Sequence, residues 1–315
     1  MELDSILGYL ESKTILVTGA TGLLGMVFVE KILRVQPNIG KLYLLIRASD
    51  ANSATHRMRN EIIEKELFRV LREKWGTDFE SFISKKVVAI PGDVASAELG
   101  VKGFELRERM CNEIQIILHS AATVDFNDRY DIALDVNTFG VLHVLNFAKK
   151  CLKLEMLVHI STAYVGVGRS GLILEDSSPM DELIKEITKS DLKVLERNMA
   201  VDKLNELKAQ NASEKVITNK MKDLGVARSK LYGWPTTYLF TKAMAEVYLE
   251  QSKGNLPITI IRPTVVTSTY KEPFPGWHQG YRTVNSVIGT FWKGALTCLP
   301  IDPTAVMDLV SFIPF

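Results

Sequence analysis

A glycine-rich turn at residues 19–25 constrains this chain more than any other feature of its sequence. The β-branched run Thr14–Thr18 before the turn predicts a short strand, and the apolar stretch Leu23–Val35 that overlaps its end predicts a helix. A strand, a glycine turn and a helix in this order form the fingerprint of a dinucleotide-binding site. The alternative interpretation is a turn with only a structural role.

Each glycine of this turn has a separate physical task. Gly19 permits the tight turn, Gly22 lets the backbone approach a pyrophosphate, and Gly25 lets the helix pack closely against the strand. The unpaired N–H groups at the start of the helix attract phosphates. The predicted cofactor-binding turn comprises Gly19, Thr21, Gly22, Leu23, Leu24 and Gly25.

Alternation of strand-like and helix-like segments predicts the fold class. Five further short apolar runs are typical of buried strands, and helical patterns fill the gaps, most clearly at 134–150. Such alternation indicates an α/β fold, a doubly wound parallel sheet of the Rossmann-like kind, covered by helices on both faces. The five runs lie at 42–46, 86–90, 114–118, 157–160 and 258–261.

Two charged segments are too long to be simple crossovers. We expect 53–75 to form one amphipathic helix with a solvated face, and 175–233 to form helices packed over one end of the sheet as a substrate lid or as a solvated face. We therefore predict a single domain over 1–315. Its parts are a core at 13–170 and 234–270, the helical insertion at about 175–233, and an incomplete substrate-side region at 271–315.

Residues at the ends of the later strands are expected to select the cofactor. The second strand ends in Arg47, where NAD-binding proteins place Asp or Glu. A guanidinium suits the 2′-phosphate of NADPH through charge-assisted hydrogen bonds, the alternative being a solvated strand end. Asp93 is placed either to accept a hydrogen bond from the adenine amino group or to form a turn, and Ala121 and Ala122 leave room for the nicotinamide half.

A tyrosine and a lysine four residues apart form the predicted catalytic pair. On a helix, Tyr238 and Lys242 share one face. A phenol with a pKa of about 10 is a poor acid at neutral pH. A nearby ammonium lowers that pKa, so we expect Lys242 to activate Tyr238 and to bind the nicotinamide ribose.

Hydroxyl groups after the fifth strand are expected to complete this site. Thr162 is the first choice to hold the substrate carbonyl and Ser161 the second, the alternative for both being a strand cap. Arg262, after the sixth strand, is expected either near the nicotinamide or in a rigid turn with a structural role.

Several strings together resemble the extended short-chain dehydrogenases/reductases. Within that superfamily the sequence is most similar to the plant-type, alcohol-forming fatty acyl-CoA reductases, over about residues 13–310. The segment 47–50 and the long charged insertion favour this family over other reductases. The resembling strings are 17–25, 42–50, 119–126, 159–165 and 238–244.

The resemblance implies a reaction and roles for the catalytic residues. Its substrate is a long-chain fatty acyl-CoA, which NADPH reduces through an aldehyde to a primary alcohol with release of coenzyme A, as in wax or suberin formation. By the same resemblance, Tyr238 protonates the carbonyl oxygen, Lys242 tunes Tyr238 and binds ribose, and Thr162 orients the oxygen.

The end of the sequence departs from this family. Its members continue beyond the segment like 307–310 into a further strand and a C-terminal helical domain, whereas this sequence stops at Phe315, as a truncated chain would. We expect cofactor binding to be retained and activity to depend on the absent part. The alternatives are another extended reductase or epimerase, acting on a nucleotide sugar or sterol, and an NADPH-binding protein that lacks catalysis.

Composition excludes several other functions. A net charge of +1 provides no field for nucleic acid, and five histidines without ligand spacing predict no metal site. Three cysteines without C-x-x-C spacing indicate reduced thiols. The sequence contains no run of about 18 apolar residues, so we predict no membrane span.

We expect acyl-CoA as the partner and a peripheral location on the cytosolic side of the endoplasmic reticulum, with the plastid as the alternative; the oligomeric state stays open.

Overall fold

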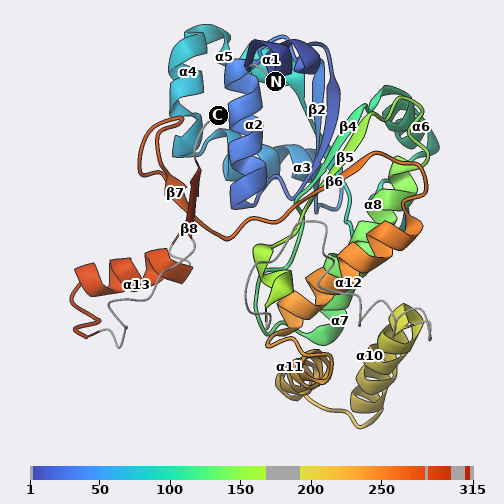
Figure 1. Cartoon of the computed structure of the whole chain (residues 1–315). Helices are drawn as coiled ribbons and strands as arrows, with labels where there is room; N and C mark the ends of the chain where they lie inside the picture. The colour runs from blue at the N-terminus through green and yellow to red at the C-terminus, as the bar shows by residue number, and fades with distance from the viewer. Residues whose placement is uncertain (1–2, 168–191, 281–282, 299–308, 313–315) are drawn as a thin grey trace.

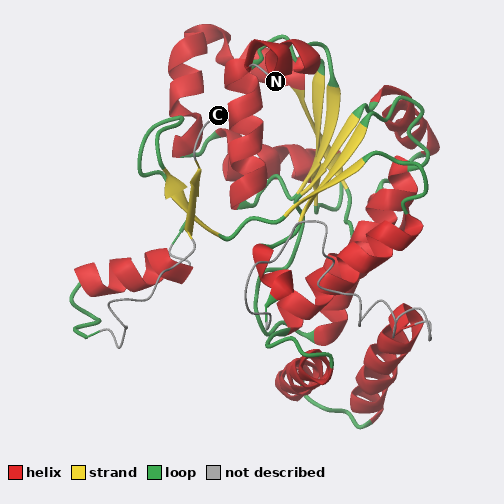
Figure 2. Ribbon diagram, in the orientation of Figure 1, coloured by secondary structure: helices red, strands yellow, loops and turns green. Residues whose placement is uncertain are grey.

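A six-stranded parallel sheet lies at the centre of the computed structural model, which describes residues 3–167, 192–280, 283–298 and 309–312 (Figure 2). The strand order is β3-β2-β1-β4-β5-β6, and every neighbouring pair is parallel. This confirms the predicted Rossmann-like α/β class. The strands are β1 (Thr14–Thr18), β2 (Lys41–Ile46), β3 (Val87–Pro91), β4 (Ile116–His119), β5 (Met156–Ile160) and β6 (Ile258–Ile261).

Helices cover both faces of the sheet because its strands are apolar on both sides (Figure 1). In β1, Ile15 and Val17 pack towards α2 (Leu23–Val35), whereas Leu16 packs on the other side with α8 (Gly140–Ala148). The strand order reverses between β1 and β4: β2 and β3 are added on one side of β1, and β4, β5 and β6 on the other. A crevice at the carboxyl ends of the strands is the usual ligand position at such a point. The remaining elements of this half are α1 (Leu3–Leu10), the 3-10 helix Ala97–Gly100 and α6 (Phe104–Glu113).

The single helix predicted over 53–75 is wrong. The segment breaks at Lys65, whose backbone is extended, and its apolar residues Ile62, Leu67 and Phe68 are fully buried in the core beside α2. One straight helix would not turn all of these side chains towards the sheet, so burial overrides the local pattern. The observed elements are α3 (Ala51–Met58), a π-helical turn (Arg59–Ile63), 3-10 turns (Glu66–Phe68 and Gly76–Asp78), α4 (Arg69–Trp75) and α5 (Phe79–Lys86).

The helix predicted over 134–150 begins earlier and is irregular. It starts as α7 (Tyr130–Ala133), widens to a π-helix at Leu134–Phe139 and continues as α8. π-helical turns are rare and often mark functional sites. Here the wide turn places Asn137 towards the loop that follows β4.

The helical insertion does not lie over the sheet as predicted. Of the range 175–233, residues 175–191 lie outside the described residues, and the rest forms α10 (Leu192–Ala209) and α11 (Glu214–Leu231). Both helices pack against α7, and α11 also contacts α12 (Thr237–Ser252), far below the sheet in Figure 1. Their buried residues join the cluster around Tyr130 and Phe240, which explains this position.

The last third of the chain adds a small second sheet. β7 (Val265–Thr269) pairs in parallel with β8 (Leu309–Phe312), and α13 (Thr283–Trp292) lies between them in sequence. β7 lies in the predicted core range 234–270, whereas α13 and β8 fall in the region 271–315 that was predicted to be an incomplete substrate side. Of that region, residues 271–280, 283–298 and 309–312 are described.

Candidate active site

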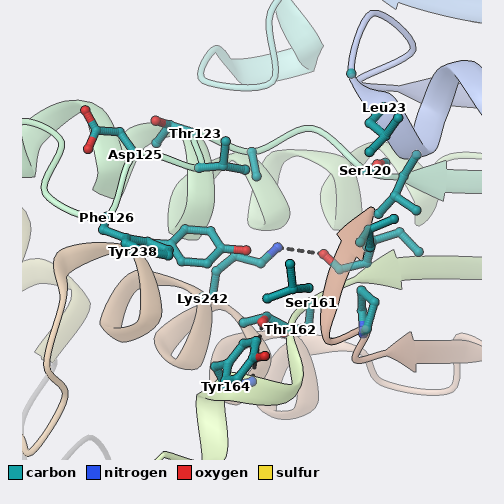
Figure 3. Close-up of a pocket in the computed structure, with 18 of the residues that line it drawn as sticks. Leu23, Ser120, Thr123, Asp125, Phe126, Ser161, Thr162, Tyr164, Tyr238 and Lys242 are labelled. Carbon is teal, nitrogen blue, oxygen red and sulfur yellow. Dashed lines mark hydrogen bonds between the residues drawn. The ribbon is translucent and has the colours of Figure 1, made fainter. Parts of the chain in front are cut away.

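A cavity of about 940 Å³ opens at the carboxyl ends of β1, β4 and β5, in the crevice between the two halves of the sheet. One wall is the glycine turn, and another is the start of α12. Side chains from segments far apart in the sequence converge on it, among them Leu23, Phe126, Thr162 and Tyr238 in Figure 3. Its lining includes Leu23, Leu24, Ala122, Phe126, Thr162, Tyr164, Tyr238, Lys242 and Gln279.

The glycine turn has the geometry that a dinucleotide requires. Gly19 has φ +72°, and a Cβ atom there would lie 2.6 Å from the backbone nitrogen of Ala121. A Cβ on Gly25 would lie 2.4 Å from the carbonyl oxygen of Gly19. Gly22 begins α2 without a side-chain cap and lines the cavity, so the first N–H groups of that helix face the space where a pyrophosphate would lie.

The predicted catalytic pair lies on the first turns of α12. Thr236 caps this helix through a hydrogen bond from the Leu239 amide, and the Tyr238 amide donates to the carbonyl of Phe126 at 3.2 Å. The phenol of Tyr238 lies 6.1 Å from the Phe126 ring, centroid to centroid. The Nζ atom of Lys242 donates to the Ile160 carbonyl at the end of β5, at 2.6 Å, so α12 is tied to the carboxyl edge of the sheet.

The acidities of this pair differ from the simple expectation. Burial lowers the pKa of Lys242 to about 8, and the nearby carboxylate of Glu246 partly opposes that shift. Burial also raises the pKa of Tyr238 above its usual range, and the hydroxyl of Thr162 acts in the opposite direction. The predicted lowering of the Tyr238 pKa by Lys242 is not borne out, because desolvation of the phenolate is the larger effect and Thr162, not Lys242, opposes it.

The two candidate hydroxyls after β5 point to different partners. Thr162 lies beside the phenol of Tyr238, and its Oγ1 accepts a hydrogen bond from the Tyr164 amide at 3.3 Å. Ser161 instead donates to the buried carboxylate of Glu246. The geometry thus favours Thr162 as the group that meets a substrate oxygen, and Ser161 as its support.

Three other predicted cofactor residues are not among those that line the described cavity. Arg47 is exposed at the end of β2, and its carbonyl accepts a hydrogen bond from Arg57. Asp93 accepts a 2.9 Å hydrogen bond from the Ala95 amide, which is the turn-forming role. Arg262 is ion-paired with Glu246 at 2.7 Å and is absent from the described cavity lining, which corresponds to its structural alternative.

Several residues of the site carry no signal in the sequence. Asn137, in the π-helical turn, accepts from the Thr123 amide at 3.0 Å and donates to the hydroxyl of Thr241, so it fixes the loop after β4 against α12. Gln279 donates to the carbonyl of Thr21 at 3.0 Å, from 258 residues further along the chain. Only the tertiary structure brings these residues to the glycine turn and to the catalytic helix.

Comparison with known proteins now adds a family to this geometry. Residues 17–312 match the family described as Male sterility protein. The chain belongs to the Male sterility protein family. The match includes the glycine turn, the hydroxyls after β5 and the whole of α12, so the site described above is the site of a family member.

Several curated relatives of this Male sterility family chain are named as fatty acyl-CoA reductases of plants. It is 53% identical to "Probable fatty acyl-CoA reductase 5" of Arabidopsis thaliana, over 98% of this chain and 62% of that protein. It is 49% identical to "Alcohol-forming fatty acyl-CoA reductase" of Simmondsia chinensis, again over 98% and 62%. The chain therefore spans about three fifths of the length of the curated relatives it matches.

Solved structures support the fold. The terminal R domain of the myxalamid PKS-NRPS biosynthetic pathway matches with a TM-score of 0.55 and 23% identity, over 82% of this chain and 51% of that one. In the described part of the chain, no helix is both long enough and apolar enough to cross a membrane. Among the same residues, no group of His, Cys, Asp or Glu is arranged to hold a metal ion.

Proposed function

We propose that this chain binds NADPH and reduces a long-chain fatty acyl-CoA to a primary alcohol through an aldehyde. The observation that carries the proposal is the convergence of Tyr238, Thr162 and the glycine turn on one cavity. The similarity to plant fatty acyl-CoA reductases supports the substrate class. Exposed Arg47, at the end of the strand beside β1, supports NADPH over NADH.

The residues that would hold the cofactor follow from the cavity. The start of α2 and Lys242, which both line the cavity, would hold the pyrophosphate and the nicotinamide ribose. Arg47 lies outside the described lining, exposed at the end of β2, and would hold the 2′-phosphate there. When bound, NADPH supplies a hydride to the carbonyl carbon of the thioester.

The chain's own groups handle the oxygen and the acyl chain. The raised pKa of Tyr238 keeps its hydroxyl protonated, so it donates a proton to the carbonyl oxygen as the negative charge develops there. Thr162 orients that oxygen beside the phenol. The resulting hemithioacetal expels coenzyme A as a thiol and leaves an aldehyde, which a second hydride and a second proton convert to the alcohol.

The cavity wall fits an apolar substrate. Val124 and Phe126, each 54% exposed, line the cavity next to Tyr238. Uncovered apolar side chains at the mouth of a site favour a lipid-like ligand.

The test is turnover with defined substrates. The chain is incubated with NADPH and palmitoyl-CoA or stearoyl-CoA, and free thiol, aldehyde and alcohol are measured. The variant Tyr238→Phe should bind NADPH nearly as well as the parent but lose turnover by about 10²–10⁴-fold, the range of a lost general acid. Full turnover by this variant would contradict the acid role.

Two other results would replace the proposal. Turnover of a nucleotide sugar without acyl-CoA turnover would indicate an epimerase or another extended reductase. NADPH binding by fluorescence without turnover of any substrate would indicate a cofactor-binding protein without catalysis.

We also propose a peripheral location at the endoplasmic reticulum, tested by fractionation of a tagged chain; recovery in plastids would contradict it.

A further inference from the structure

A buried carboxylate behind the active site joins three elements of the fold. Glu246 lies on α12, one turn beyond Lys242 and two turns beyond Tyr238, so the three residues share one face of the helix. Its side chain is only 3% exposed, and it is not among the cavity-lining residues. It therefore acts through its neighbours.

The contacts of Glu246 fix the ends of two strands. Its carboxylate accepts a hydrogen bond from the hydroxyl of Ser161, directly after β5. It also accepts from Nε and Nη2 of Arg262, directly after β6, at 3.1 and 2.7 Å. The backbone of the same two segments is joined where the Ser161 amide donates to the Ile261 carbonyl at 2.7 Å.

Lys242 has few charged neighbours besides this carboxylate. Its charge acts on His119 on β4 and His159 on β5. Tyr238 and Glu246 lie on its own helix, and Glu246 is in turn paired with Arg262 after β6. Both histidines are neutral, because burial and the Lys242 charge lower their pKa values, His119 to about 3. In the described part of the chain, Glu246 is the only carboxylate that acts on the Lys242 ammonium.

We propose that Glu246 is a positioning residue, which clamps the ends of β5 and β6 onto α12 and supplies the counter-charge for the buried Lys242 ammonium beside the cofactor site. Burial of an ammonium without a counter-charge is costly and favours its neutral form. A neutral Lys242 would still accept or donate hydrogen bonds but would not attract a developing phenolate. Glu246 thus keeps the lysine in its active form at neutral pH. The inference rests on the proposed function only for the catalytic roles of Tyr238 and Lys242.

The first test measures the charge of Lys242 without any substrate. The protein is labelled with ¹⁵N at the lysine Nζ atoms, the Lys242 signal is assigned by its loss in Lys242→Arg, and its titration is followed by NMR. In Glu246→Gln the pKa of Lys242 should fall by about one unit, which is the effect of one charge a helical turn away at intermediate dielectric. The matched control is Glu250→Gln, on the same helix, where the carboxylate is 61% exposed and paired with Lys253. That control should leave the titration unchanged.

A second variant separates charge from mere packing. Arg262→Gln breaks the same ion pair but leaves the carboxylate of Glu246 in place, so the pKa of Lys242 should stay level or rise. A fall equal to that of Glu246→Gln would overturn the proposal, because it would attribute the effect to loosened structure. If Glu246→Gln does not fold, the Lys242 titration is measured in Arg262→Gln alone: a level or raised pKa supports the proposal, and a lowered pKa overturns it. An unchanged titration in folded Glu246→Gln would also overturn it.

The second readout uses the cofactor. NADPH affinity, measured by fluorescence, should begin to fall about one pH unit lower in Glu246→Gln than in the parent, since the ribose then loses a charged partner at lower pH. Glu250→Gln should follow the parent. A shifted Lys242 titration in Glu246→Gln, together with no acyl-CoA turnover by the parent, would support the clamp and contradict the proposed function. Acyl-CoA turnover by the parent, together with an unshifted Lys242 titration in Glu246→Gln, would contradict the clamp and support the proposed function.

Discussion

The glycine turn allows a prediction in which two similar substitutions have opposite consequences. Gly19→Ala and Gly22→Ala each add one methyl group, three residues apart. At Gly19 the backbone has φ +72°, and the new Cβ would lie 2.6–2.8 Å from backbone atoms of Ser120 and Ala121. At Gly22 the backbone has φ −83°, and the nearest atom, the Gly19 carbonyl oxygen, lies at 3.2 Å.

The magnitudes follow from these distances. An alanine in the left-handed region costs about 1–2 kcal/mol, and forcing a methyl group against rigid backbone costs about 1–3 kcal/mol. Gly19→Ala should therefore lower the free energy of unfolding by about 2–5 kcal/mol. Gly22→Ala should change it by less than about 1 kcal/mol, because alanine adopts this backbone and loses only a weak N-cap preference. Its methyl group enters the cavity beside the start of α2, so NADPH affinity should fall at least about tenfold, or about 1.4 kcal/mol.

The assays are urea denaturation and a fluorescence titration with NADPH on both variants. The expected pattern is an unstable Gly19→Ala, and a stable Gly22→Ala with weak binding. Parental NADPH affinity in Gly22→Ala would refute the position assigned to the pyrophosphate. Equal losses of stability in the two variants would refute the argument from backbone geometry.

Three further predictions concern charge. Arg47→Glu should weaken NADPH binding more than NADH binding, and an unaltered ratio of the two dissociation constants would contradict the 2′-phosphate assignment. Glu196→Ala removes a fully buried carboxylate that pairs with Arg228, so urea denaturation should show a loss of about 3–5 kcal/mol, whereas a loss below 1 kcal/mol would contradict the importance of this pair. Because the folded-state pKa of Lys242 is about 8, below its unfolded value, the unfolded chain binds more protons above that pH. This lysine should therefore make the protein more stable as pH rises from 8 towards 10, and the same slope in Lys242→Met would exclude it as the cause.

Local patterns predicted most of the sheet because its strands are short, apolar and separated by clear turns. All six strands of the main sheet lie within two residues of their predicted positions, and the helix at Leu23–Val35 has the expected bounds. The pattern failed at 53–75, where the need to bury Ile62, Leu67 and Phe68 broke a helix that the charge pattern favoured. It also failed for the position of α10 and α11, which depends on the cluster around Tyr130 rather than on any local property.

The sequence by itself determined the family-typical chemistry of this chain: a glycine turn between a strand and a helix, a Tyr–Lys pair at helical spacing, and hydroxyls after a strand. Such features are local, so adjacent residues suffice to specify them. Only the tertiary structure decided which hydroxyl meets Tyr238, because Ser161 and Thr162 are neighbours in sequence but have different partners. It also decided which groups surround the Lys242–Glu246 pair, since Arg262, His119 and His159 come from three segments outside α12. Long-range packing and burial set those interactions, and no local pattern encodes them.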